Sequence, residues 1–184
     1  VLPVRDYIYG EYAAHVFGYE SEINEMELEK RKDEGYKSGD IIGKFGLERV
    51  YDKDIRGVKG GDQVEVDVSG RPVQILGRQS PVPGNDLVLN IDKNIQEAAE
   101  RAVDEQLAIV HANAAAAVVM NPQTGEVLAM VSRPAFNPNL FAGGISTQNW
   151  NVLNNNPFHP MDNKAITGEY PPGSTFKIVT GTAA

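Results

Sequence analysis

The segment Ser80-Pro81-Val82-Pro83-Gly84 constrains the fold most, because it interrupts every regular pattern near the middle of the chain. Two prolines and a glycine within five residues disfavour both helix and central strand. The stretch before this segment is broken by glycines, and the stretch after it carries longer apolar repeats. We therefore predict a domain boundary here, with one domain at residues 1–84 and a second at residues 85–184.

The first predicted domain combines short strands with one helix. Residues 13–19 predict a strand closed by a turn. A helix is expected between Ser21, a suitable N-cap, and Gly35, a suitable C′ residue, because acidic side chains lead and basic ones trail along it. Glycines recur over residues 39–61 and predict a loop-rich region. Residues 63–76 alternate with period two around a Ser-Gly turn, which predicts a β-hairpin.

The second predicted domain begins with a strand at residues 86–91. Asp92 is expected to cap a helix that runs through Leu107, because apolar residues recur there at helical spacing. Two apolar runs within residues 114–131, joined by a Pro/Gly turn, predict a second hairpin that is buried on both faces. Residues 134–173 lack periodicity, so we expect a long connection that lines a functional surface or is partly mobile.

Composition excludes several classes of function. A net charge of −8 argues against nucleic acid as a partner, because phosphate binding needs clustered Lys and Arg. Cysteine is absent, which excludes disulfides and thiolate metal sites. The histidines, His15, His111 and His159, are too scattered for a zinc motif, and we expect them at the surface or at caps. No metal and no cofactor is therefore expected.

No apolar run approaches the roughly 20 residues that a membrane-spanning helix needs. The longest candidate is Ala114 to Met120. No signal peptide is visible, because the chain starts in Val1-Leu2-Pro3 without a basic segment followed by an apolar one. The missing initiator Met and the helical pattern at the last residues lead us to expect a piece of a longer protein.

Catalysis is suggested only by the stretch from Tyr170 to Val179, which reads Tyr-Pro-Pro-Gly-Ser-Thr-Phe-Lys-Ile-Val. The prolines disfavour helix before Gly173, and Ser174 is expected to open one. Lys177 then falls on the same helix face, roughly 5–6 Å away between Cβ atoms. A neutral lysine can activate a serine hydroxyl, and a helix N-terminus can stabilise an oxyanion. Taken alone, the spacing favours an N-cap serine and a solvated lysine over a catalytic pair.

The residues around this pair extend the pattern. Tyr170 to Lys177 resembles the first active-site motif of class B penicillin-binding proteins, and most of all that of their elongation-type group, penicillin-binding protein 2. Further stretches are similar to that family's pedestal motifs and to the opening of its transpeptidase domain. They are Arg5, Gly10, Ala14-His15-Val16 and Gly18-Tyr19; Gly43, Gly46-Leu47-Glu48, Tyr51-Asp52 and Arg56-Gly57; Leu87 to Gln96; and Asn121 to Met130.

The resemblance implies an α+β chain. Residues 1–84 would be a mixed α/β pedestal of the dimerisation type, and residues 85–184 the N-terminal portion of an α/β transpeptidase domain of the serine β-lactamase-like fold. It further implies a peptidoglycan D,D-transpeptidase, in which Ser174 attacks D-Ala-D-Ala stem peptides or β-lactams and Lys177 is the favoured base. Its pedestal would contact a SEDS-type glycosyltransferase and other elongation-complex proteins. The parent protein would be membrane-anchored, with its catalytic domain on the extracytoplasmic side.

The family's remaining motifs, Ser-x-Asn and Lys-Thr-Gly, should follow the nucleophile and do not. Lys37-Ser38-Gly39 precedes Ser174 by a whole domain, and Thr180-Gly181-Thr182 lacks the lysine. We therefore expect this fragment not to be catalytically competent.

Two alternatives stay open from the sequence. A class D β-lactamase or a related sensor also fits Ser-Thr-Phe-Lys, although such proteins lack a pedestal like residues 1–84. A non-catalytic interaction module that binds wall-elongation partners is the other alternative, with the glycine-rich region and the acidic helix as its surface.

Overall fold

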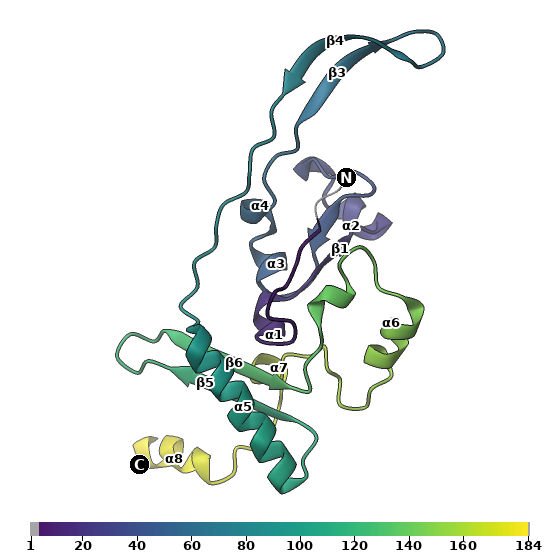
Figure 1. The fold of residues 1–184 in the computed structure, drawn as a ribbon. Helices are drawn as coiled ribbons and strands as arrows, with labels where there is room; N and C mark the ends of the chain where they lie inside the picture. Colours follow the sequence, from purple (N-terminus) through teal and green to yellow (C-terminus); the bar gives the residue numbers. More distant parts are fainter. Residues whose placement is uncertain (1–3, 184) are drawn as a thin grey trace.

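The computed structural model describes residues 4–183 and confirms a mixture of helices and antiparallel strands. It is elongated, with a hairpin projecting at one end and the C-terminal helix at the other (Figure 1). The strands form three two-stranded antiparallel sheets, β1–β2, β3–β4 and β5–β6. The helices in chain order are α1 (Ala14–Phe17), α2 (Glu25–Lys30), α3 (Gly46–Val50), α4 (Asp52–Ile55), α5 (Lys93–Val110), α6 (Thr147–Asn154), α7 (Lys164–Thr167) and α8 (Lys177–Ala183), with 3₁₀ turns η1 (Lys32–Glu34), η2 (Pro138–Leu140) and η3 (Gly173–Phe176).

The strand predicted at residues 13–19 is wrong. A short helix, α1, forms there instead, preceded by Ala13 in the left-handed conformation. The first strand, β1 (Glu20–Glu22), follows and pairs with β2 (Ile41–Gly43). Ala13 and Ala14 are buried against the second half of the chain, so tertiary packing overrides the local strand preference.

The helix predicted between Ser21 and Gly35 is shorter than expected. Asn24, rather than Ser21, is the N-cap, and its side chain accepts a hydrogen bond from the Glu27 N–H while Glu27 bonds back. Ser21 lies in β1, and the helix passes into η1 before Gly35 ends it with φ +78°. The start was misplaced because a capping box outweighs a single serine as a helix start signal.

Glycine is required where β2 meets α3. A Cβ on Gly43 would lie 1.8 Å from the carbonyl oxygen of Glu48. A Cβ on Gly18 would lie 1.9 Å from the carbonyl oxygen of Phe45, and Gly18 also has φ +81°. The region predicted to be loop-rich therefore contains close backbone contacts, and it also holds the short helices α3 and α4.

The first predicted hairpin is confirmed. β3 (Gly61–Val66) and β4 (Pro72–Gln79) pair antiparallel, with two register shifts. Their residues are exposed almost throughout, and the hairpin projects from the body (Figure 1).

The strand predicted at residues 86–91 is wrong, because these residues pair with no strand in the described part of the chain. The preceding Pro/Gly segment is not a free linker either. Val82 forms an isolated bridge with Val58, and the Asn85 N–H donates to the Asp54 carbonyl at 2.9 Å. The position of the domain boundary stays a prediction.

The helix and hairpin of the second half are confirmed. The Asp92 side chain accepts hydrogen bonds from the N–H groups of Asn94 and Ile95 and so begins α5. Strand β5 (Ala115–Met120) pairs with β6 (Val127–Arg133). The hairpin is not buried on both faces: β5 alternates between half-buried and exposed, with Val118 and Met120 exposed. Helix α5 packs against this hairpin and leaves part of it in solvent.

The connection at residues 134–173 contributes to the core instead of only lining a surface. Phe136, Phe141 and Leu153 are buried, and they pack together with Ala14 of α1. Tyr19 stacks on Phe141 with 3.8 Å between ring centroids. Aromatic burial needs no period-2 or period-3.6 pattern, so sequence periodicity could not reveal this packing.

Candidate functional site

Ser174 and Lys177 lie on one continuous turn near the C-terminal end of the chain. Gly173 begins η3 with φ +56°, a conformation that favours glycine, directly after two prolines. Ser174 lies in this 3₁₀ turn, and Lys177 begins α8. The Lys177 N–H donates to the carbonyl oxygens of Ser174 and Thr175, which joins the two helical segments. Side chains three residues apart on a 3₁₀ turn are aligned, so both groups share one face.

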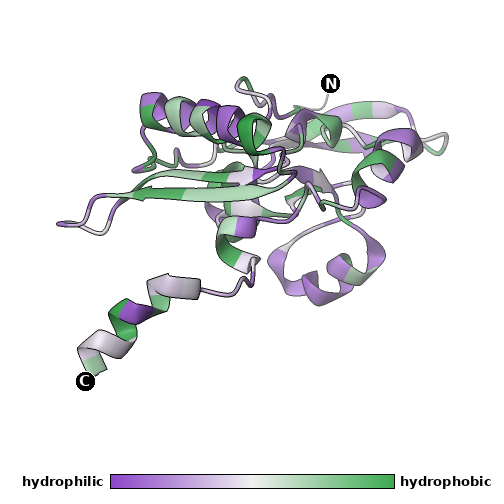
Figure 2. Cartoon of the chain, turned by 90° about the horizontal axis from the view of Figure 1, so that it is seen from below, coloured by the Kyte–Doolittle hydropathy of each residue, from purple (hydrophilic) through white to green (hydrophobic). Residues whose placement is uncertain are grey.

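The pair is open to solvent. Residues 169–183 are exposed throughout, and no hydrogen bond joins the Ser174 hydroxyl to the Lys177 amine in the described residues. Figure 2 shows α8 apart from the body of the molecule. Its apolar side chains are also exposed, with Ile178 at 76% and Val179 at 56%. The structure thus places the two predicted residues on one turn and encloses neither.

A buried carboxylate that sequence reasoning missed joins the two halves of the chain. Glu100 of α5 is 1% exposed. One of its oxygens accepts from the Ala13 N–H at 2.7 Å and from the Gln96 amide at 2.6 Å, and the other accepts from Arg133 at 2.8 Å. Arg133 also donates to Asp104 at 2.6 Å. We call Glu100, Gln96, Arg133 and Asp104 the joint cluster.

The joint cluster pairs two carboxylates with one guanidinium. Burial by itself lowers the pKa of Arg133, but the hydrogen bonds and charges of Asp104 and Glu100 outweigh burial and raise it above its ordinary value. Glu100 and Asp104 are four residues apart on one helix face, which is the only sequence signal that could have indicated the cluster. The long-range partners of Glu100, Ala13 and Arg133, could not be predicted from the spacing of residues along the sequence.

Several residues of the first half that resemble family motifs hold the fold together. Arg5 contacts both carboxylate oxygens of Glu48, at 2.9 and 3.1 Å. Asp52 accepts from the Gly43 N–H at 2.9 Å and also from the Tyr36 hydroxyl and Arg31. Both acids are buried. The arrangement is that of a structural ion-pair network.

The three histidines take separate positions. His15 is buried, contrary to the surface or cap position expected for it, and its Nε2 lies 2.7 Å from the Pro160 carbonyl oxygen. His111 ends α5 and His159 lies in a turn, both with positive φ. Among residues 4–183 no group of His, Asp and Glu side chains is arranged to hold a metal ion. Within that range no helix is long and apolar enough to cross a membrane.

Two family models match most of this chain. The penicillin-binding protein dimerisation domain matches residues 1–89, and the penicillin-binding protein transpeptidase domain matches residues 115–184. The peptidoglycan D,D-transpeptidase MrdA of Acinetobacter baumannii is 41% identical over 173 residues, 94% of this chain and 25% of that protein. MrdA of Escherichia coli K12 is 38% identical, with coverages of 98% and 28%. The chain thus spans about a quarter of the length of these curated relatives.

Solved structures show the same similarity. Penicillin-binding protein 2 of Helicobacter pylori, in a complex with MreC, superposes with a TM-score of 0.80 at 30% identity, covering 97% of this chain and 32% of that one. Penicillin-binding protein 2 of Pseudomonas aeruginosa, in complex with WCK 5153, gives 0.76 at 38% identity, with coverages of 98% and 34%.

Proposed function

Because the chain belongs to the penicillin-binding protein family, we propose that Ser174 and Lys177 perform acyl transfer on peptidoglycan stem peptides in the complete protein. The supporting observation is their position on one helical turn after Pro171-Pro172-Gly173, inside the residues that match the transpeptidase model. The curated relatives are peptidoglycan D,D-transpeptidases, and we assign the same reaction to the protein that carries this chain.

The proposed reaction proceeds through an acyl-enzyme. The Ser174 Oγ attacks the carbonyl carbon of the penultimate D-Ala while the neutral Lys177 amine takes its proton. Collapse of the tetrahedral intermediate breaks the peptide bond, and the terminal D-Ala leaves with that proton on its nitrogen. The amine of a neighbouring stem then attacks the ester carbonyl, forms the cross-link and returns the proton to Ser174. A β-lactam carbonyl would acylate the same oxygen.

The backbone around Ser174 suits this chemistry. The Ser174 N–H has no acceptor among the described residues, so it is available to donate to an oxyanion. The Lys177 amine must be neutral to act as a base, which requires surroundings that disfavour its charge. Lys177 is exposed here, and we propose that residues 1–184 alone do not react with penicillin.

Labelling with a fluorescent penicillin tests the assignment. In the complete protein, Ser174→Ala should abolish the covalent label, and Lys177→Ala should slow labelling by on the order of 10² to 10⁴-fold, the usual contribution of a positioned base. Ser69→Ala is the matched control, because Ser69 lies in the turn of the projecting hairpin and should label normally. Full labelling of Ser174→Ala would refute the proposal, and stoichiometric labelling of residues 1–184 would refute the inactivity of the fragment.

We also propose a partner role and a location for the first half. The H. pylori relative forms a complex with MreC, and by analogy residues 1–89 would contact elongation-complex proteins and a SEDS-type glycosyltransferase. The β3–β4 hairpin exposes Val64, Val66, Val73 and Ile75, an apolar surface suited to contact. The complete protein would be membrane-anchored with this region on the extracytoplasmic side. Retention of these proteins after deletion of residues 62–78 would contradict the use of the hairpin.

The class D β-lactamase alternative is weakened by the match of residues 1–89 to a dimerisation domain. Deacylation separates the two activities. A transpeptidase stays acylated by penicillin, whereas a β-lactamase releases the hydrolysed product and turns over.

A further inference from the structure

Helix α7 is the last described element before Ser174 that lies against the body of the structure. It packs against both strands of the β5–β6 hairpin. The residues from Glu169 to the end of the described chain are exposed. Figure 1 shows the chain leaving α7 and running to α8 at the C-terminal end. Helix α7 is therefore the upstream attachment of the turn that carries Ser174.

A buried hydroxyl group fixes the start of α7 on β6. Ser132 of β6 is 2% exposed. Its Oγ accepts a hydrogen bond from the Lys164 N–H at 3.0 Å and donates one to the Asp162 carbonyl oxygen at 3.1 Å. The hydroxyl thus bonds to the backbone on both sides of Asn163. Without it, neither backbone group would have this partner.

Asn163 holds the same turn from the helix side. It is 3% exposed, and its Oδ1 caps α7 by accepting a hydrogen bond from the Ala165 N–H at 3.1 Å. Its Nδ2 lies 3.5 Å from the Met130 sulfur. Met130 and Ser132 are two residues apart on β6 and therefore share a face of the strand. One face of β6 thus holds the first turn of α7 through two buried side chains.

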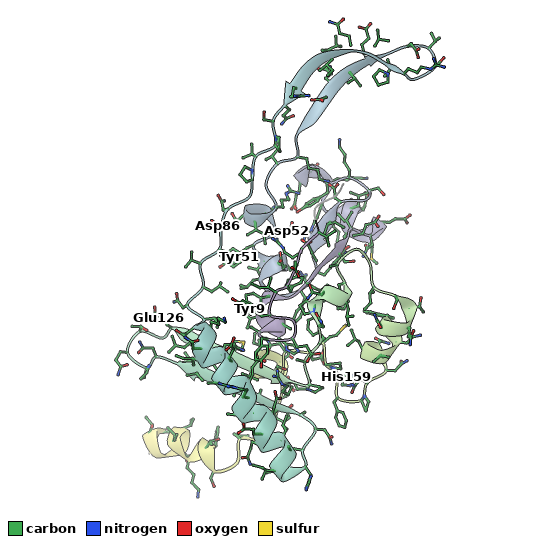
Figure 3. The ribbon with its side chains drawn as sticks, viewed as in Figure 1. Tyr9, Tyr51, Asp52, Asp86, Glu126 and His159 are labelled. Atoms are coloured by element: carbon green, nitrogen blue, oxygen red, sulfur yellow. The ribbon has the colours of Figure 1, made fainter. Side chains whose placement is uncertain are left out.

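Further contacts hold α7 and the residues that follow it. The Lys164 amine donates to the His159 carbonyl oxygen at 2.8 Å, which ties α7 to the turn that carries His159 (Figure 3). A Cβ on Gly168 would lie 2.6 Å from the Lys164 carbonyl oxygen and 2.6 Å from the Tyr170 ring. The chain after α7 therefore packs closely over the end of the helix, where a glycine is needed.

The connection from α7 to Ser174 is short and stiff. It consists of residues 168–173 and contains Pro171 and Pro172, whose rings fix φ. Proline-rich connections act as semi-rigid spacers, unlike connections rich in Gly and Ser. A shift or rotation of α7 is therefore carried to the turn that begins at Gly173 instead of being absorbed in between.

We propose that Ser132 and Asn163 are positioning residues for the nucleophile of the complete protein: they fix α7 on β6, and the stiff connection carries that placement to Ser174. Each acts through α7 and touches no reacting atom. Acyl transfer needs the attacking oxygen about 3–3.5 Å from the carbonyl carbon, so a displacement of about 1 Å slows the reaction strongly. This inference rests on the role proposed above for Ser174.

Acylation kinetics of the full-length protein test the proposal. The rate of labelling by a fluorescent penicillin, measured over a range of penicillin concentrations, gives a saturating rate constant and a half-saturating concentration. Ser132→Ala and Asn163→Ala should each lower the rate constant on the order of 10- to 100-fold and keep the half-saturating concentration within about threefold, because alignment is lost and the binding of penicillin is not.

A conservative substitution and a matched control separate positioning from folding. Asn163→Asp keeps an acceptor for the Ala165 N–H and should restore most of the rate, since Asp caps helices as well as Asn does. Asn137 caps η2 in the same way, with its Oδ1 3.0 Å from the Asn139 nitrogen, but η2 does not lead directly to Ser174. Asn137→Ala should therefore acylate at the unsubstituted rate, whatever its effect on Tm.

Gly168→Ala is a second test that leaves both buried side chains in place. The added methyl group must displace the chain between α7 and Ser174, so acylation should slow while Tm changes little. Gly77→Ala in the projecting hairpin is its control, because its methyl group meets only the end of the Gln63 side chain, and should leave the rate unchanged.

The proposal is overturned if Ser132→Ala and Asn163→Ala acylate at the unsubstituted rate constant, or if only their half-saturating concentrations change. It is also overturned if Asn137→Ala slows acylation as much at an equal loss of Tm. If the first two variants do not fold, an unchanged rate constant in Gly168→Ala overturns it. Failure of the proposed function has a different signature, since peptide mapping would then place the label on a residue other than Ser174.

Discussion

At the scale of single residues, Glu100 is a polar side chain that links the two halves of the chain. It is buried, and it bonds to the backbone of the first half through Ala13 and to the hairpin of the second half through Arg133. A buried charge with several partners becomes costly when a partner is removed, because the remaining groups stay desolvated. The joint cluster therefore makes the contact between the two halves sensitive to a single substitution.

Replacing Glu100 with Ala should lower the free energy of unfolding by about 3–5 kcal/mol, because Arg133 and the Ala13 N–H lose a buried acceptor. Asp104→Ala should cost less than about 1 kcal/mol, since the Asp104 side chain is 52% exposed. Urea denaturation of both variants measures the difference. If both variants lost the same free energy of unfolding, burial of the carboxylate would not determine how much each carboxylate contributes to stability.

His15 should make stability depend on pH. Burial lowers the pKa of His15, and the nearby Lys164 and Arg133 lower it further, against the Pro160 hydrogen bond and Glu100. The folded protein thus holds His15 neutral, while the unfolded chain takes up a proton near the ordinary pKa of about 6.5. Stability present above pH 6.5 should therefore be lost as the pH falls from 6.5 toward the lowered pKa. Between pH 7.5 and 5, the free energy of unfolding should fall less for His15→Asn than for the unsubstituted protein. If both proteins show the same dependence of this free energy on pH, His15 is not the cause of the loss of stability.

At the scale of elements, close backbone contacts decide where the short helices and strands pack. Gly43 of β2 lies so near the Glu48 carbonyl that no side chain fits between them. Gly77 of β4 has no such neighbour: a Cβ there would lie 3.8 Å from the nearest atom, the end of the Gln63 side chain. The two strand glycines thus form a matched pair.

Gly43→Ala should destabilise the protein by at least about 2 kcal/mol, because β2 and α3 must move apart to accept the methyl group. Gly77→Ala should change stability by no more than about 0.5 kcal/mol. Thermal or urea unfolding of the two variants tests this contrast. A tolerated Gly43→Ala would mean that the contact of β2 with α3 is loose.

At the scale of the whole molecule, one core belongs to both halves. Phe136, 1% exposed, packs with Ala14 of α1, with Phe141 and with Leu153. His15 and Tyr19 of the first half also meet the Phe136 ring edge-on. Both halves should therefore unfold together, although their sequence patterns differ.

Phe136→Ala should cost about 3–5 kcal/mol and should lower the stability of both halves equally. Native-state hydrogen exchange can follow the amide of Ile42 in the first half and that of Ala129 in the second. A loss of protection confined to Ala129 would show that the halves are independent, and Phe158→Ala, at an exposed site, is the control.

The sequence by itself determined the local features of this protein. Asp92 as a helix cap and the hairpins predicted within residues 63–76 and 114–131 depend on neighbouring residues, and the structure has each of them. Ser174 is predicted to open a helix, whereas it lies inside the 3₁₀ turn Gly173–Phe176 and the α-helix begins at Lys177. The resemblance to penicillin-binding proteins, confirmed by the family models, rested on the same local motifs.

Only the tertiary structure decided the contacts between distant residues. It turned residues 14–17 into a helix, left residues 86–91 without a strand partner and gave the aperiodic segment after Pro134 much of the core. It also assembled the joint cluster from α5, β6 and the Ala13 backbone. The physical reason is that burial and long-range hydrogen bonds outweigh local propensities of a few tenths of a kcal/mol per residue, and no spacing along the chain records them.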